Sequence, residues 1–295
     1  MNFLKRKYYQ LLLKYLKLTK SSDVQFVKAQ YFYKTNQKLN LEQPIEFAEK
    51  IQWLKLYYYT ERFQDYVDKY EVRAIVKEKI GAQYLNDIHT VYSAIEDIIF
   101  DELPQQFVLK GTHGSGYNVI VDDKSKLDWN STRKEIKSFL SRNYYDKCRE
   151  RIYRTIPPRM ISEKYLNELD GGHIIDYKYY CFGGVPKYIL IKAFEDGKMK
   201  NCFYDLEWNK IQPDSTTKEY LKRDIDKPSV LNEMTEVAKK LSDGFPFLRV
   251  DLYAIGAKVY FGELTFLPNG GWKRIVIERF NKEFGDLIVL PEANS

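Results

Sequence analysis

An arginine and a carboxylate alternate with apolar residues near the end of the chain, in Arg249-Val250-Asp251, and Glu263 follows after a turn. Side chains alternate across a β-strand, so Arg249 and Asp251 face the same side. Centring the turn on Ala257 pairs residue 251 with 263 and 249 with 265, and paired Cβ atoms lie about 5 Å apart. Two carboxylates that close repel unless a cation lies between them, and Mg²⁺ prefers oxygen ligands. The pattern predicts a magnesium site beside an arginine that can stabilise a phosphate or an oxyanion.

The alternative interpretation of this hairpin is a solvated sheet face that carries an ordinary pair of arginine and carboxylate. Three large apolar residues bear on the choice, Phe261, Phe266 and Leu267. Residues of this kind favour burial, so the hairpin is not expected to be a free surface. We therefore favour the site over the solvated face.

A second candidate region is Lys110-Gly111-Thr112-His113-Gly114-Ser115-Gly116, where a lysine ends an apolar run and small residues follow. Glycines let backbone N–H groups approach a polyphosphate, and the ammonium neutralises it. The alternative is an ordinary glycine-rich hairpin turn. The run is not a Walker A motif, which needs Gly-Lys-Ser/Thr before a helix. It is not a nucleophile elbow either, because His113 and Tyr117 stand where that motif has glycines.

Helices and strands must hold these residues in place. Apolar periodicity predicts helices at 3–18, at 45–56, at 66–80 with Gly81 as the residue after the helix, at 129–153 before Pro157-Pro158, and at 230–241. Short apolar runs predict strands at 107–109, 119–121, 160–161, 176–182, 188–193, 248–253 and 259–264. The expected class is α+β with a mostly antiparallel sheet in the second half. We divide the chain into a helical region 1–60, a small lobe 61–156 and a large lobe 157–295.

Composition and charge limit the classes of function. Hydrophobic residues make up 44% and charged residues 30%, with a mean hydropathy of -0.51, which is typical of a folded soluble protein. The net charge of +6 comes from the start of the chain, where six cations precede the first acidic residue: Lys5, Arg6, Lys7, Lys14, Lys17 and Lys20. Since this charge lies in one helix rather than along a domain face, a nucleic-acid binder is disfavoured.

Residues 3–18 have the pattern of a basic amphipathic helix. Leu4, Tyr8, Leu11, Leu12 and Tyr15 recur at helical spacing. Such a helix can lie on an anionic membrane surface, bind a partner, or dock on its own protein. The lysines interrupt any signal-peptide core, and no run reaches the roughly 20 apolar residues that span a bilayer. Peripheral membrane contact therefore stays open.

The cysteines and histidines are few and scattered. Three of each occur, without a CxxC pair or a histidine cluster. Neither a disulfide framework nor a zinc site is supported. Reduced thiols and the lack of an export signal favour the cytoplasm.

Together these segments resemble the ATP-grasp superfamily, in which two α+β lobes close on ATP. Phe107 to Gly116 corresponds to the lysine strand and its loop, and Ile161 to Leu166 to the hinge strand that meets adenine. Asp176-Tyr177-Lys178 is similar to the charged strand that follows. Arg249-Val250-Asp251 with Glu263-Leu264-Thr265 resembles the terminal metal hairpin. The order covers roughly residues 60 to 275, and is far more specific than any one motif.

The greater likeness within that superfamily is to the TupA-like branch of teichuronopeptide and capsule biosynthesis. Three segments carry it, Lys50-Ile51-Gln52-Trp53-Leu54-Lys55, Asp68-Lys69-Tyr70-Glu71-Val72-Arg73 and Phe261-Gly262-Glu263-Leu264-Thr265. Many ATP-grasp ligases have Asn where this chain has Thr265. A hydroxyl can hold Mg²⁺ directly or through water, so the departure affects the metal position rather than the fold.

The resemblance implies roles for the matching residues. It assigns ATP binding to a first set: Lys69, Lys110, Thr112, His113, Gly114, Ser115, Gly116, Glu163, Lys164, Tyr165, Leu166 and Asp176. It assigns Mg²⁺ to Asp251, Glu263 and Thr265, and the transfer chemistry to Arg249 and Lys178. The alternatives are a lysine on a helix surface for Lys69 and a solvated strand face for Lys178.

The implied activity is an ATP-dependent ligase. The γ-phosphoryl group passes to a carboxylate, such as a uronic acid of a polysaccharide precursor, and an amine then displaces phosphate. Three rival classes remain: a kinase of the same fold, a glycosyltransferase of a capsule pathway, and a basic nucleic-acid binder with steeply salt-dependent affinity. Consumption of ATP with a carboxylate separates the ligase from a glycosyltransferase, and an amide product separates it from the kinase.

Overall fold

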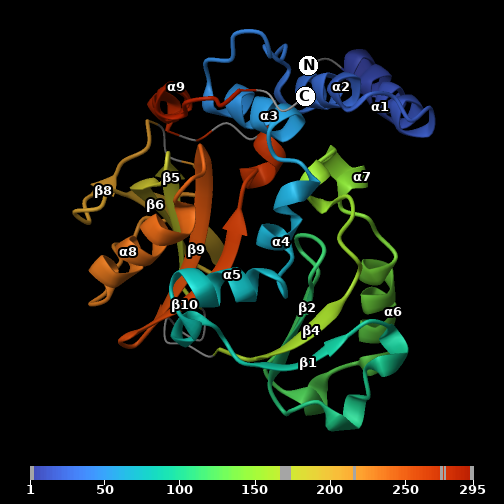
Figure 1. The fold of residues 1–295 in the computed structure, drawn as a ribbon, viewed down its shortest axis with the longest axis vertical. Coiled ribbons are helices and arrows are strands. Elements are labelled where there is room, and N and C mark those ends of the chain that lie inside the picture. The colour runs from blue at the N-terminus through green and yellow to red at the C-terminus, as the bar shows by residue number, and fades with distance from the viewer. Residues whose placement is uncertain (1–2, 167–173, 215–216, 273–274, 276, 293–295) are drawn as a thin grey trace.

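Two sheets, joined by short helices, dominate the computed structural model, which describes residues 3–166, 174–214, 217–272, 275 and 277–292 (Figure 1). The α-helices are α1 (Phe3–Leu18), α2 (Asp23–Thr35), α3 (Phe47–Tyr57), α4 (Gln64–Val67), α5 (Val72–Lys79), α6 (Trp129–Leu140), α7 (Tyr145–Cys148), α8 (Leu231–Ser242) and α9 (Glu278–Leu287). The strands are β1 (Ile88–Tyr92), β2 (Phe107–Gly111), β3 (Asn118–Val121), β4 (Met160–Lys164), β5 (Asp176–Phe182), β6 (Val185–Glu195), β7 (Lys198–Tyr204), β8 (Lys210–Ile211), β9 (Phe247–Ile255) and β10 (Lys258–Thr265). The architecture is α+β, as predicted.

The large sheet has six strands in the order β10-β9-β5-β6-β7-β8. Because successive side chains of β5 point to opposite faces, Tyr179 and Cys181 meet α8, where Cys181 lies 3.9 Å from the carbonyl oxygen of Ala238. The other face carries Lys178 and, on β9, Arg249. The alternation therefore separates an apolar face, covered by α8, from a charged face that is available for a site.

The small sheet has four strands in the order β1-β4-β2-β3. Its core is a separate apolar cluster in which Phe107 and Leu109 of β2 pack with Ile136 and Phe139 of α6. Each of these four side chains is buried. Figure 1 shows α6 beside this sheet and the large sheet on the other side of the molecule. The two sheets therefore have separate cores.

The first helices form a third region. Helix α3 packs on α9, with the rings of Phe47 and Phe284 5.7 Å apart, and so joins the core of the large sheet. Helix α1 contacts α2 and has no buried residue. Figure 1 places α1 and α2 at one corner of the molecule, near the two ends of the chain. The predicted helix at 3–18 is confirmed.

Two of the predicted helices are interrupted. The expected helix at 66–80 is wrong at its start, because the chain leaves the helix at Asp68 and resumes it at Val72. The side chain of Asp68 stabilises this turn by accepting hydrogen bonds from the backbone N–H groups of Tyr70 and Glu71. Competition of this kind is typical of Asp at the start of a helix. The end is as predicted, with Gly81 in a positive-φ conformation of 107° after α5.

The expected helix at 129–153 is also wrong as a single element. It divides into α6, α7 and a 3₁₀ turn at Arg151–Tyr153. Arg149 adopts the left-handed conformation after α7, with φ 57°, which ends that helix. Strands β1, β7 and β8 were not predicted. The predicted strand at 176–182 coincides with β5, the other predicted strands lie within longer ones, and the predicted helix at 230–241 is confirmed as α8, shifted by one residue.

Strand β4 pairs with β1 and β2. By strand pairing, residues 160–164 therefore go with the small sheet, although the predicted division of the chain places them with the large lobe. The division itself stays a prediction.

The hairpin of β9 and β10 contains a bulge at Gly262. Ile255 pairs with Lys258, so the turn consists of residues 256 and 257, and the register then shifts between Phe261 and Glu263. A Cβ at position 262 would lie 2.9 Å from the carbonyl oxygen of Asp251, which only glycine avoids. The bulge restores the predicted pairing of 251 with 263 and of 249 with 265.

Two further predictions from the sequence concern disulfide bonds and membrane-spanning helices. Cys148, Cys181 and Cys202 are free and buried. In the described part of the chain, no helix combines the length and apolar character that crossing a bilayer demands.

Candidate active site

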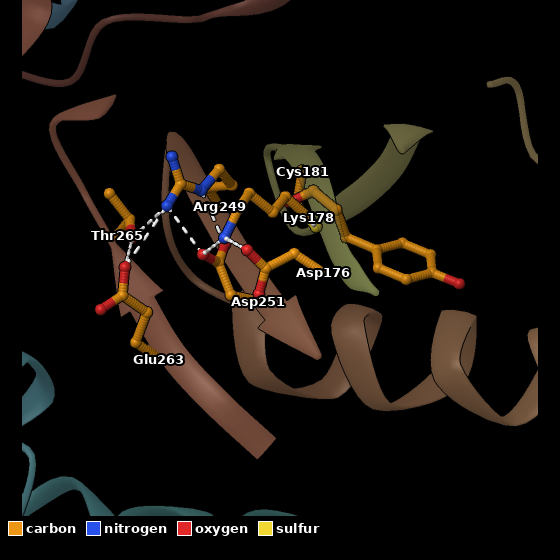
Figure 2. Close-up of polar contacts among 8 residues, drawn as sticks. Asp176, Lys178, Cys181, Arg249, Asp251, Glu263 and Thr265 are labelled. Atoms are coloured by element: carbon orange, nitrogen blue, oxygen red, sulfur yellow. Dashed lines mark hydrogen bonds and ion pairs between the residues drawn. The ribbon is translucent and has the colours of Figure 1, made fainter. Parts of the chain in front are cut away.

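A buried ionic cluster occupies the charged face of the large sheet. Arg249 donates through Nε to Asp251 Oδ1 at 2.6 Å and through a terminal nitrogen to Oδ2 at 2.7 Å. Lys178 donates to the same Oδ2 at 2.6 Å and lies 3.2 Å from Asp176 (Figure 2). The register explains the contact, because Lys178 pairs directly with Asp251 across β5 and β9. Since Lys178 is buried, a solvated strand face is the wrong interpretation of this residue.

The charges of the cluster support one another. Burial raises the pKa of Asp251, but Arg249 and Lys178 outweigh it, so the net shift is downward. Burial lowers the pKa of Lys178, and Asp251 with Asp176 reverses that shift to give a net rise. Burial raises the pKa of Asp176 despite the neighbouring lysine. Of the two carboxylates, Asp176 is therefore the one with the greater tendency to hold a proton.

Arg249 also links Asp251 to the second predicted carboxylate. Its terminal nitrogen lies 3.4 Å from Glu263 Oε1 and 3.0 Å from the hydroxyl oxygen of Thr265. Thr265 donates to Glu263 at 3.0 Å. Figure 2 shows Arg249 between Asp251 on one side and Glu263 with Thr265 on the other. The cation that the sequence predicts between the two carboxylates is thus, in this structure, a guanidinium group.

The same oxygen atoms have the chemistry that Mg²⁺ requires. A carboxylate offers about four acceptor positions, of which Asp251 uses three. Within the described residues, Glu263 accepts only through Oε1, and its side chain is 38% exposed. No group of three or more His, Cys, Asp or Glu side chains in that part of the chain is placed to hold a metal ion. The fourth acceptor position of Asp251 and the partly exposed carboxylate of Glu263 suit a cation that keeps several waters, as Mg²⁺ does.

The turn at Asp68 brings a lysine to the glycine-rich loop. Thr112 donates to Asp68 at 3.2 Å and Arg159 donates to it at 2.9 Å, while the backbone N–H of Lys69 donates to the carbonyl of Thr112 at 3.2 Å. The ammonium of Lys69 then donates to the carbonyl of Gly114 at 2.5 Å. A lysine on a helix surface is thus the wrong interpretation of Lys69, since the helix is broken there and burial lowers its pKa.

The glycine-rich loop divides into an interior part and an outer part. Thr112 and His113 are buried, and a ring nitrogen of His113 lies 3.0 Å from the carbonyl oxygen of Phe139. Their side chains therefore face the small lobe rather than a ligand. Ser115 lines a cavity, as described below, and Gly116 adopts a positive φ of 82°. The outer part of the loop is the part that can meet a phosphate.

The predicted hinge strand pairs with the lysine strand. Lys110 forms an ion pair with Glu163 at 2.6 Å, and the two side chains are 25% and 9% exposed. Lys164 is exposed and Tyr165 is partly buried. Leu166, with Lys69, Lys110 and Glu163, lines a cavity of about 30 Å³ between the sheets. The structure thus brings both predicted phosphate lysines to one cleft with parts of the predicted adenine strand.

Two larger cavities extend over the charged face of the large sheet. The first, of about 680 Å³, is lined from the large sheet by Lys178, Arg249, Glu263 and Thr265 and from the small lobe by Ser115. We call it the central cavity. The second, of about 340 Å³, lies over β5 to β8, and we call it the side cavity. Lys192, Arg249 and Asn269 line both, so the two cavities are neighbours.

Lys192 is a candidate that the sequence interpretation missed. It pairs with Asp176 across β5 and β6, and its pKa is lowered by burial and then by Lys178 and Arg249. Within the described residues it makes no hydrogen bond or ion pair, although it lines both cavities. Strand parity could have found it, because Ile189 and Ile191 are buried on the α8 face and leave residue 192 on the charged face.

A second missed group lies at the far wall of the central cavity. Glu150 and Cys148 line it, and the thiol of Cys148 donates to Glu150 at 2.8 Å. Burial raises the pKa of Glu150 and lowers that of Lys55, which is fully buried nearby. No sequence motif singled out Glu150, since it lies in the irregular segment between α7 and the following 3₁₀ turn.

The segment at residues 50–55 lies in α3 and directs two polar side chains toward the turn that follows β10. Gln52 and Lys55 are both fully buried and both donate to the carbonyl of Gly270, at 2.9 and 3.3 Å. Gly270 and Asn269, in the turn that follows β10, line the central cavity. The polar residues of α3 therefore position the wall of the cavity rather than contact a ligand.

Comparison with known proteins gives a family match. The sequence model of the TupA-like ATP-grasp family matches residues 49–289. No curated protein matches the chain.

Solved structures that resemble this chain include two ligases and a synthase. The D-alanine–D-alanine ligase of Bacillus anthracis in complex with ATP is 16% identical, with a TM-score of 0.42 over 75% of this chain and 61% of that chain. The ATP-grasp ligase PsnB with its minimal precursor is 11% identical, with a TM-score of 0.39 over 71% and 54%. The N5-carboxyaminoimidazole synthase of Aspergillus clavatus with ADP is 11% identical, with a TM-score of 0.39 over 70% and 46%. The chain thus spans less than two thirds of the length of these enzymes.

Proposed function

The chain belongs to the TupA-like ATP-grasp family, and on that basis we propose that it is an ATP-dependent ligase that activates a carboxylate as an acyl phosphate and transfers the acyl group to an amine. One observation carries the proposal. Lys178, Arg249 and Glu263 of the large sheet and Ser115 of the small lobe line the same cavity. Gly262, the chain neighbour of Glu263, lines the cleft that holds two further lysines, Lys69 and Lys110. Such a concentration of positive charge between two lobes suits phosphoryl transfer.

ATP is proposed to bind between the two sheets. Lys69 and Lys110 line the cleft together with Leu166 and Tyr253, which offer apolar surface for a base. A cavity of about 30 Å³ does not hold a purine base, so the cleft has to widen when ATP binds. The ion pair of Lys110 and Glu163 is the contact that a phosphate would replace, because Lys110 is partly exposed.

The first chemical step is an in-line transfer. A carboxylate oxygen of the substrate bonds to the γ-phosphorus, and the bond from that phosphorus to the bridging oxygen breaks to release ADP. Lys69 and Lys110 neutralise the leaving side, while Arg249 stabilises the charge on the transferred group. Arg249 can do so without losing its orientation, since two hydrogen bonds to Asp251 hold it.

In the second step the amine attacks the acyl carbon and phosphate leaves, which yields one amide, one ADP and one phosphate. The attacking amine must lose a proton as the amide forms. Mg²⁺, when bound by Asp251, Glu263 and Thr265, would neutralise the phosphates.

The side cavity is proposed to hold the carboxylate substrate. Lys192 presents a partly buried ammonium without a partner among the described residues, at the junction with the central cavity. Aromatic side chains of Tyr180, Phe203 and Tyr220 line the same cavity, and flat apolar faces of this kind stack on sugar rings. A uronic acid of a polysaccharide precursor combines the two features, since it has a sugar ring and a carboxylate.

The test is a screen for ADP release over sugar acids and amines, with hydroxylamine as a substitute for the natural amine. Hydroxylamine converts an acyl phosphate into a hydroxamate, so the proposal expects hydroxamate that depends on both ATP and the sugar acid. ADP without hydroxamate would favour a kinase of the same fold. Consumption of a nucleotide sugar with no use of ATP would replace the ligase by a glycosyltransferase.

A further inference from the structure

Helix α1 has two apolar faces, and only one of them packs on the protein. Tyr9 stacks on Phe32 of α2 with ring centroids 4.6 Å apart, and the ammonium of Lys5 lies 4.6 Å from the centre of the same ring. Leu12, Leu13 and Leu16 are partly buried. These side chains recur at helical spacing and account for the contact between α1 and α2.

The second face is a stripe of large apolar side chains that stays exposed. Leu4, Tyr8, Leu11, Tyr15 and Leu18 are between 58% and 83% exposed. They follow one another at intervals of four and three residues, which puts them on one side of a helix along a length of about 21 Å. We call these five residues the outer stripe. No residue of α1 is buried.

Cations border the outer stripe. Lys7 and Lys14 follow Leu4 and Leu11 by three residues and therefore lie on the adjacent flank. Helix α1 contains no Asp or Glu, and the first acidic residue of the chain is Asp23. Lysines so placed can extend their ammonium groups toward phosphates while apolar neighbours enter the acyl boundary.

We propose that the outer stripe of α1 docks this protein on an anionic lipid surface. Apolar area and positive charge then act together, as in interfacial helices. A second copy of the chain fits the stripe less well, because two α1 helices would bring lysine flanks together without an acidic residue to offset them. Spanning is excluded for α1, since its 16 residues are too few and too polar.

The docking helix is connected to the proposed site. Lys34 of α2 lines the central cavity, and α2 is the helix on which α1 packs. The same pair of helices therefore contacts the cavity and carries the outer stripe. The docking proposal does not depend on the ligase activity, because its evidence is confined to α1.

Co-sedimentation of the full chain with lipid vesicles tests the proposal. Vesicles of phosphatidylcholine with added phosphatidylglycerol should bind the protein at low salt, and those of phosphatidylcholine alone should bind it at least about tenfold more weakly. The variant Leu4→Ser/Leu11→Ser/Leu18→Ser should lower the partition coefficient by on the order of a hundredfold. Lys7→Glu/Lys14→Glu should lower it by more than about tenfold on the anionic vesicles.

A matched control removes exposed apolar side chains elsewhere. Ile99, Ile120 and Val289 are 52%, 67% and 81% exposed, so Ile99→Ser/Ile120→Ser/Val289→Ser makes the same chemical change away from α1. It should bind vesicles as the wild type does. Circular dichroism should show that all variants remain folded.

Three results would overturn the proposal. The wild type could stay in the supernatant with anionic vesicles at low salt. The α1 variant and the control variant could bind vesicles equally. The wild type could elute as a dimer that the α1 triple variant converts to a monomer without any change in vesicle binding, which would assign the stripe to a second copy.

Discussion

The two sheets each carry lysines beside carboxylates, but in different surroundings. On the large sheet, Lys178 and Asp251 form a pair that is almost fully buried, with side chains 8% and 2% exposed. On the small sheet, Lys110 and Glu163 form a pair whose lysine is 25% exposed. A buried ion pair fixes the positions of its two side chains, because separating them would leave an unpaired charge in a medium of low polarity. A pair at a cleft can exchange its partner for a ligand. We therefore expect the pair of Lys178 and Asp251 to position its neighbours, and the lysine of the pair of Lys110 and Glu163 to bind a ligand.

The largest expected effect comes from breaking the buried cluster. Asp251→Ala would leave Arg249 and Lys178 buried without their main partner, and we expect the free energy of unfolding to fall by about 3–5 kcal/mol. Chemical denaturation measures this quantity. Asp251→Asn keeps the volume and some hydrogen bonds, and should lose less. A loss below about 1 kcal/mol for Asp251→Ala would show that the cluster does not hold the sheet geometry.

The corresponding change on the small sheet should affect turnover rather than stability. Lys110→Ala is expected to lower ATP turnover by at least about a hundredfold, because a phosphate loses its charged partner. The free energy of unfolding should fall by no more than about 2 kcal/mol, since the lysine is partly exposed. Lys126→Ala, at a lysine 80% exposed in the same lobe, is the control for both quantities. Unchanged turnover would remove Lys110 from the site.

Lys192 tests whether the large sheet also binds a substrate. Lys192→Met keeps the length of the side chain and removes its charge, so the KM for the carboxylate should rise by about tenfold to thirtyfold while the KM for ATP stays the same. Lys192→Arg should restore part of the affinity. A rise in the KM for ATP alone would move Lys192 from the carboxylate to the nucleotide.

The smallest effect concerns the pair of Lys200 and Glu195 at the far end of β6, whose side chains are 11% and 12% exposed. The hydrogen bond from Lys200 and those from the backbone of Arg223 and Lys222 outweigh burial and lower the pKa of Glu195 to about 2. A carboxyl with a lowered pKa stabilises the fold above its ordinary pKa and loses that contribution as pH falls toward about 2.

Glu195→Gln should therefore reduce the free energy of unfolding at neutral pH by roughly 1 kcal/mol or less, since the amide oxygen of glutamine can still accept part of these hydrogen bonds. The difference between wild type and variant should shrink as the pH is lowered from 6 toward 3, in denaturation curves recorded at several pH values. A difference that grows on acidification would mean that the pKa of Glu195 is raised rather than lowered.

The two sheets also differ in how far sequence reasoning could reach. The hairpin of β9 and β10 follows strict alternation, so the pairing of Asp251 with Glu263 could be predicted from parity. The predicted turn is centred on Ala257, whereas the observed turn is centred between residues 256 and 257. The bulge at Gly262 compensates for this difference of half a residue. A bulge depends on a close approach of two backbones, which no local pattern encodes.

The small lobe was harder to predict because tertiary contacts override its helical pattern. Apolar periodicity continues through residues 66–80, but Thr112, Arg159 and two backbone groups bind Asp68 and interrupt the helix. Thr112 and Arg159 lie far from Asp68 in the sequence. The same applies to Lys192 and Glu150, whose importance comes from cavities formed by several elements.

The measurement that tests the ligase proposal most directly follows an oxygen atom. A carboxylate that supports ADP release is labelled with a heavy oxygen isotope and incubated with the protein, ATP, Mg²⁺ and the amine. An acyl phosphate intermediate places one substrate oxygen on phosphorus, so each phosphate released should contain one labelled oxygen. Phosphate without the label, formed together with ADP and amide, would contradict activation of the carboxylate by phosphoryl transfer.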